Sequence, residues 1–266
     1  SDYRVANVST EKIRKEDRGG DAPTLTLVEN PDILVALVRE RRPRVHCLMN
    51  TVVQKFTADG ITAIGGIPSM TSSEEEIESF VTKTDALTIN LGTLDEARRK
   101  VIRIAVTIAN RQGKPWIVDP VHCDYSPSRL EFAHELCRLH PSIIRGNAAE
   151  MAVIGDVGGA LRIQTGAVDS LSDVDRKVRI VNGHALMAKV TGTGCLSGGI
   201  IAAFMAVEPD AMLAAASALT VTGVSAEFAA RQASGPGSFE VAFLDALFNL
   251  KSEDILSHAR IEHDED

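Results

Sequence analysis

The chain has 266 residues, of which 44% are hydrophobic, 24% are charged and 4% are aromatic, and its formal net charge is −8. The negative charge argues against a nucleic-acid partner, because neutralising phosphates requires a basic face. The four cysteines show no Cys-Xaa-Xaa-Cys spacing, and no His pair has metal-ligand spacing. We therefore expect reduced thiols in a cytoplasmic setting rather than a zinc site or a disulfide framework. No apolar run reaches about 18 residues, so no membrane span is expected.

Helical and strand patterns alternate along most of the chain. The spacing of apolar residues predicts helices at 31–41, 51–59, 94–112, 127–139, 148–154, 195–207, 210–232 and 239–250, with a further helix entry at 72–76. Strands are predicted at 44–48, 61–66, 86–90, 115–118, 143–144, 161–165 and 177–181, the last ending in a hairpin turn at Asn182-Gly183. This alternation predicts a single α/β domain with a mostly parallel central sheet and helices on both faces.

The two ends are expected to lie outside that domain. Residues 1–27 are predicted to form a flexible tail, 28–258 the domain, and 259–266 an acidic tail whose end at 262–266 frays. One connection inside the domain is short. The strand expected at 161–165 follows the helix ending at 154 almost at once, although a parallel crossover usually needs a dozen or more residues. Either the topology changes there or a segment is missing.

The turn Thr191-Gly192-Thr193-Gly194-Cys195 precedes a long apolar helix. Glycines let backbone N–H groups approach a ligand closely, and the helix N-terminus adds about half a positive charge. Together these features predict an anion cradle suited to a phosphate. It is not a Walker motif. A tight turn with no ligand is the alternative reading.

Other polar residues follow predicted strands, where ligands bind in open α/β sheets. Asp119 and Glu150 are candidates for holding Mg²⁺, and Arg145 is a candidate for binding phosphate oxygens. Each of these charges also fits an ordinary surface or capping role. Cys195 heads the apolar helix, where a lowered thiol pKa would make it a weak base; a small core residue is the alternative.

These stretches, taken together, resemble the hydroxyethylthiazole kinases of thiamine salvage, within the ribokinase-like superfamily. The Arg-Gly-Asn-Ala-Ala-Glu run at 145–150 and the Val-Thr-Gly-Thr-Gly-Cys run at 190–195 are specific as a pair. Further matching stretches occur in family order at 45–53, 68–70, 90–94, 118–121, 182–184 and 235–239.

The resemblance implies ATP-dependent phosphorylation of 4-methyl-5-(2-hydroxyethyl)thiazole, with Mg²⁺, by a homotrimer whose thiazole sites lie between subunits. The substrate-binding positions it implies are Asn50, Met70 and Gly192. The ATP-binding positions are Arg145, Asn147 and Thr165, and the metal-binding positions are Asp119 and Glu150. Catalysis is assigned to the cradle of Gly192, Thr193, Gly194 and Cys195, the last where related sugar kinases carry an Asp base.

The chain departs from the family pattern in two places. After Asp-Pro-Val the family usually has Gly-Xaa-Gly, whereas this chain has His122-Cys123-Asp124. The family also has a longer, helix-containing segment between Glu150 and Thr165. Two other functions therefore stay open: a ribokinase-like kinase of another small alcohol, such as a hydroxymethylpyrimidine or a sugar, and a thiazole-binding protein that has lost catalysis. A substrate panel and an ATP titration distinguish them.

Overall fold

The computed structural model describes residues 30–263, and the tail predicted at 1–27 lies outside that range. Over the described residues the strands form one nine-stranded sheet in the order β2-β1-β3-β4-β5-β6-β7-β8-β9. Strands β1 to β6 pair in parallel, and β7 to β9 extend the sheet as antiparallel strands. The predicted α/β architecture is confirmed.

The strands occupy short segments. Their bounds are β1 Arg44–Leu48, β2 Ile67–Ser69, β3 Ala86–Asn90, β4 Trp116–Asp119, β5 Ile143–Asn147, β6 Leu161–Thr165, β7 Asp169–Ser172, β8 Lys177–Ile180 and β9 Ile261–His263. All five residues of β3 are buried, as expected for a parallel strand covered on both faces.

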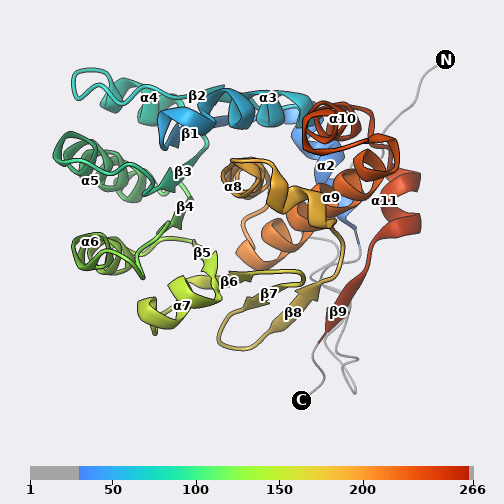
Figure 1. Cartoon of the computed structure of the whole chain (residues 1–266). Coiled ribbons are helices and arrows are strands. Elements are labelled where there is room, and N and C mark those ends of the chain that lie inside the picture. The colour runs from blue at the N-terminus through green and yellow to red at the C-terminus, as the bar shows by residue number, and fades with distance from the viewer. Residues whose placement is uncertain (1–29, 264–266) are drawn as a thin grey trace, which may run out of the picture.

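Helices cover the sheet on both sides (Figure 1). One face carries α4 Ile77–Lys83, α5 Glu96–Arg111, α6 Pro127–Cys137 and α7 Ala148–Ile154. The other carries α2 Pro31–Arg41, α3 Gln54–Ile64, α8 Thr193–Met205, α9 Ala211–Gln232, α10 Pro236–Asn249 and α11 Ser252–His258. Short 3-10 segments lie at Thr51–Val53 and Ala185–Lys189.

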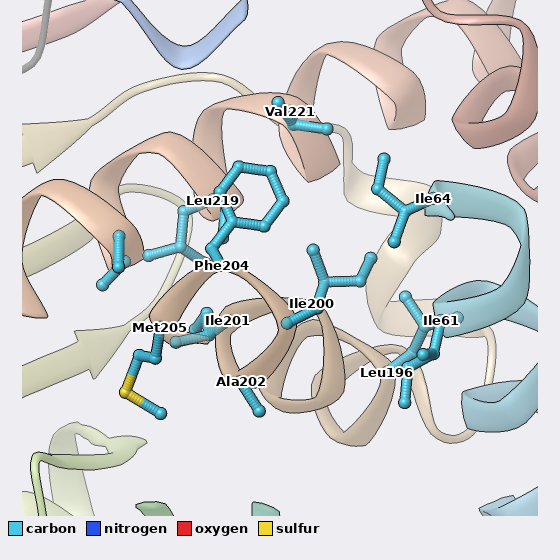
Figure 2. Close-up of a cluster of buried hydrophobic side chains, with 14 of the residues drawn as sticks. Ile61, Ile64, Leu196, Ile200, Ile201, Ala202, Phe204, Met205, Leu219 and Val221 are labelled. Carbon is cyan, nitrogen blue, oxygen red and sulfur yellow. The ribbon is translucent and has the colours of Figure 1, made fainter. Parts of the chain in front are cut away.

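Helix α8 lies between the sheet and the other helices of its face, so nearly every residue of it is buried. It packs closely against α3, where a Cβ at Gly60 would lie 2.4 Å from Leu196 and one at Gly199 would lie 2.8 Å from Ile61. Figure 2 shows the isoleucines of α3 facing Leu196 and Ile200 of α8. This packing fixes the N-terminus of α8 against the carboxyl ends of the strands.

Helix α9 is 22 residues long and apolar, and its length and composition would allow it to cross a membrane. However, 78% of its most apolar 18-residue stretch is buried inside the protein. It is therefore built as a core helix, packed against α8 and α10.

Several predicted elements need correction. Residues 61–64 belong to α3, and the strand follows at 67–69. The reason is that the apolar residues of α3 pack on α8 and that Gly65, at φ +110°, ends the helix.

The predicted hairpin turn at Asn182-Gly183 is wrong. The Asn182 side chain is buried and donates to the His258 carbonyl at 2.7 Å. The predicted tail at 259–266 is wrong for residues 261–263, which pair with β8 as β9. Helix α11 and strand β7 were not predicted.

The short connection before β6 does not change the topology. Helix α7 itself makes the crossover, and β6 pairs in parallel with β5 with Asn147 opposite Thr165. Residues 148–160 are about a dozen, which is close to the minimum for a parallel connection.

Candidate active site

The N-terminus of α8 is the centre of the candidate site. Gly192 precedes the helix at φ +92°, a conformation that favours glycine, and a Cβ there would lie 2.7 Å from Val53. The helix begins at Thr193, two residues earlier than predicted, so the N–H groups of its first turn have no intrahelical acceptor. The Thr193 hydroxyl donates to the Val190 carbonyl at 3.0 Å, so its proton is already used, whereas its backbone N–H stays available to a ligand.

Cys195 lies beside the carboxyl end of β3. The Asn90 side chain, at the last position of β3, donates from Nδ2 to the Cys195 sulfur at 3.2 Å and accepts from the Gly92 N–H at 2.9 Å. A Cβ at Gly92 would lie 2.9 Å from both Asn50 Nδ2 and Asn90 Oδ1, which places the ends of β1 and β3 together. Asn90 was not singled out from the sequence, because only its contact with Cys195 distinguishes it from other strand-end residues.

The expected lowering of the Cys195 pKa is wrong. Burial, followed by the nearby charge of Asp119, raises the pKa of the thiol to about 12, and Arg145 only partly opposes this. The helix N-terminus would favour a thiolate, but desolvation outweighs it here. Cys195 is a neutral thiol at pH 7.

Arg145 lies in the buried part of β5 and connects the cradle to the acidic residues. Its Nη1 donates to Asp119 Oδ2 at 3.2 Å, and a Cβ at Gly194 would lie 3.5 Å from the same nitrogen. The Nε atom is enclosed and has no hydrogen-bond partner. An arginine that is 7% exposed and has an unused donor is suited to bind an anion brought in by a ligand.

Asp119 lies close enough to Glu150 to feel its charge, and the metal-binding role of the two carboxylates stays a prediction. Burial raises the pKa of Asp119 to about 6; Arg145 lowers it and the charge of Glu150 raises it further. Glu150 accepts from the His122 N–H at 2.9 Å and from the Asn147 N–H at 2.8 Å. Two carboxylates held this way are oxygen donors of the kind that Mg²⁺ prefers.

The remaining predicted residues lie at the edges of this centre. Asn147 forms a capping box with Glu150, so its side-chain oxygen is already used, and Thr165 lies on the neighbouring strand. Met70 follows β2 at the sheet edge. His46 holds the chain on both sides of it, with Nδ1 2.7 Å from Ser69 Oγ and Nε2 2.9 Å from the Thr71 carbonyl.

Two side chains absent from the predicted set also adjoin the centre. Burial raises the pKa of Asp169, on β7. The Arg145 guanidinium lies close enough to oppose part of this rise. Arg98 donates to the carbonyls of Asn90 and Gly92, which fixes the end of β3. Their roles depend on partners in other elements, so no sequence spacing indicates them.

Solved structures place this fold in the ribokinase-like class of small-molecule kinases. A ribokinase-like superfamily protein from Enterococcus faecalis matches 88% of this chain and 100% of its own with a TM-score of 0.63, and at 13% identity this shows the fold alone. The hydroxyethylthiazole kinase structure from Pyrococcus horikoshii matches 88% of this chain and 99% of its own, with a TM-score of 0.85 and 34% identity.

Sequence comparison gives the family. The hydroxyethylthiazole kinase family model matches residues 35–162 and 159–253. A probable hydroxyethylthiazole kinase from Agrobacterium fabrum is 70% identical over 92% of this chain and 99% of its own length, and a hydroxyethylthiazole kinase from Granulibacter bethesdensis is 40% identical over 88% and 95%. The chain belongs to the hydroxyethylthiazole kinase family.

A second family model, for the DNA/pantothenate metabolism flavoprotein C-terminal domain, matches residues 1–54. Most of that segment lies outside the described residues, and the described part forms α2 and β1 of the kinase sheet.

The comparisons also locate the short crossover. The family model matches in two segments that overlap at residues 159–162, where β6 begins. The Granulibacter alignment spans 260 residues but takes up only 88% of the 266-residue chain, so that relative carries residues that this chain lacks. The Agrobacterium alignment spans 246 residues and 92% of the chain, so it needs no such insertion.

Proposed function

We propose that this chain transfers the γ-phosphoryl group of ATP to the hydroxyl of 4-methyl-5-(2-hydroxyethyl)thiazole, as part of thiamine salvage. The observation that carries the proposal is the meeting of Arg145, Asp119 and the N-terminus of α8 at one edge of the sheet. Family membership supplies the substrate class.

The residues divide the work of phosphoryl transfer. The unpaired Nε of Arg145 binds phosphate oxygens, and the N–H groups at the start of α8 stabilise the charge that develops on the transferred group. Asn147 and Thr165, at adjacent strand ends, contact the nucleotide. Asn50, Gly192 and Met70 hold the thiazole alcohol so that its hydroxyl oxygen faces the γ-phosphorus.

Cys195 orients the hydroxyl rather than deprotonating it beforehand. Its thiol is neutral at pH 7 because burial raises its pKa to about 12. In a loose phosphoryl transition state positioning and electrostatics dominate, so a strong base is not required. The hydroxyl proton passes to an oxygen of the phosphoryl group as the new O–P bond forms and the bond to ADP breaks.

Asp119 and Glu150 fit Mg²⁺, because both offer carboxylate oxygens and only Asp119 has a cationic partner within the described residues. When bound, Mg²⁺ supplies neutralising charge to the phosphates. Ionised Asp119 is the form that binds it.

We further propose a cytoplasmic homotrimer. The support is the family resemblance, the free cysteines, and the position of Met70 beside β2, the terminal strand of the sheet, where a second subunit can complete the thiazole site. Light scattering coupled to size-exclusion chromatography tests the trimer.

The activity is tested by coupled ADP release with a panel of alcohols: the hydroxyethylthiazole, a hydroxymethylpyrimidine, pyridoxal and ribose. We expect ADP release with the thiazole alcohol at a kcat/KM at least about tenfold above any other. ATP hydrolysis without transfer, or preference for another alcohol, contradicts the proposal.

A further inference from the structure

The turn after β4 gathers ligand-forming side chains beside the active centre. His122, Asp124 and Glu150 each offer one ligand atom, and these atoms all lie within 4.8 Å of one another. Ligands on opposite sides of one divalent ion are roughly 4.4 Å apart, since metal–ligand bonds are about 2.0–2.3 Å long. Small side-chain rotations are therefore enough to bring all three onto a single ion.

One carboxylate oxygen of this cluster lacks any hydrogen-bond partner. Asp124 Oδ1 is enclosed and has no hydrogen-bond partner, which is costly for a carboxylate unless a cation occupies the site. Neither Asp124 nor Glu150 forms an ion pair with Lys or Arg in the described part of the chain. Glu150 is nevertheless 5% exposed, so its charge is largely removed from water.

The backbone presents His122 to this cluster in an unusual way. His122 has φ +57°, a left-handed conformation in which non-glycine residues are uncommon, and its ring stacks on Tyr125 with centroids 5.0 Å apart. Its N–H donates to Glu150 Oε1.

We propose that His122, Asp124 and Glu150 bind a first-row transition-metal ion such as Zn²⁺ or Mn²⁺ beside the phosphate-binding centre. Imidazole nitrogen is a good ligand for these ions and a poor one for Mg²⁺, which prefers oxygen. The site differs in two of its three ligands from the Asp119–Glu150 pair assigned to Mg²⁺. Its occupancy does not depend on the proposed kinase activity, because metal binding is measured without nucleotide or alcohol.

The test is isothermal titration of the metal-free full chain with ZnCl₂, and separately with MgCl₂. Wild type is compared with His122→Gly, which fits the left-handed backbone, and with Asp124→Asn. The control is His140→Gly, because His140 is also exposed and left-handed at φ +60° but lies outside the cluster.

We expect wild type and His140→Gly to bind Zn²⁺ alike, and His122→Gly and Asp124→Asn to bind it at least about tenfold more weakly. His122→Gly should leave the Mg²⁺ affinity within about twofold of wild type. Zn²⁺ binding that is absent from wild type, unchanged by both cluster substitutions, or equally weakened by His140→Gly overturns the proposal. Circular dichroism on each variant confirms that it is folded before titration.

Discussion

The two sides of the site are built differently. The acceptor side is formed by Asn90, Gly192 and Cys195. It is rigid because glycines let α8 pack closely against α3 and against the ends of the neighbouring strands. The proposed metal side, formed by Asp119, His122, Asp124 and Glu150, is the end of β4, the turn after it and the start of a short helix. The acceptor side is thus held by close packing, whereas the metal side is held by N–H groups that donate to the Glu150 carboxylate.

Arg145 joins the two sides, so its loss should have the largest effect. Arg145→Ala removes the buried hydrogen-bond donor proposed for the phosphate oxygens and leaves Asp119 without its cationic partner. We expect kcat/KM for ADP release to fall about 100- to 1,000-fold. The control is Arg162→Ala, because Arg162 lies on the adjacent strand β6 and its guanidinium donates only to carbonyls at the end of α7. We expect kcat/KM of this variant to stay within about threefold of wild type. An Arg145→Ala enzyme as active as that control would remove Arg145 from the mechanism.

Gly192→Ala tests the rigidity of the acceptor side. The new Cβ meets Val53 at 2.7 Å in a left-handed backbone, so we expect a loss of about 1–3 kcal/mol in the free energy of unfolding, with a parallel loss of turnover. Gly113→Ala is the control, because Gly113 also has a left-handed backbone, at φ +65°, but has open space around it. Its loss of stability therefore measures the backbone strain alone, without a steric clash of the new Cβ. If urea unfolding gives equal losses for both, the close packing at Gly192 is not important.

The metal side should respond to pH through Asp119. Its pKa is raised to about 6, so the folded protein holds a proton there below pH 6 that the unfolded chain releases. Protonation removes a Mg²⁺ ligand, and we expect Mg²⁺ affinity to be about tenfold weaker at pH 5 than at pH 7. Calorimetric titration measures this, and Asp119→Asn should bind weakly at both pH values. A flat profile in wild type would show that Asp119 is not a ligand.

Asp119 also gives a stability signature with a defined sign. Because its folded pKa lies above the unfolded value, its contribution favours folding below about pH 4 and is lost as the pH rises through 6. Urea unfolding of wild type relative to Asp119→Asn at pH 5 and pH 7 measures that loss, with Asp245→Asn on the exposed part of α10 as the control.

Cys195→Ala should have the smallest effect on rate. The thiol is neutral and accepts only the Asn90 amide, so we expect a fall in kcat of about tenfold or less. Cys137→Ala, a half-buried cysteine at the end of α6 on the other face, should change nothing. A loss larger than that of Arg145→Ala would restore a base role for the sulfur.

The sequence indicates candidate residues on both sides of the site, but it does not indicate which of them meet. The turn at 191–195 depends on residues that are neighbours in the chain, so their types indicate the cradle. The partners of Asn90 and Arg145 come from other elements, and only folding brings them together. Likewise Ile61 and Ile64 have the types expected in a strand, but packing on α8 holds them in a helix. The Cys195 pKa was predicted from its helix position, whereas burial determines it.

The most direct test of the central claim is ³¹P NMR of wild type incubated with ATP, Mg²⁺ and the thiazole alcohol. We predict a phosphate monoester resonance that grows in step with ADP and is absent without the alcohol or without Mg²⁺. ADP accumulating with inorganic phosphate alone, or no reaction in a folded protein that binds the thiazole, would contradict it.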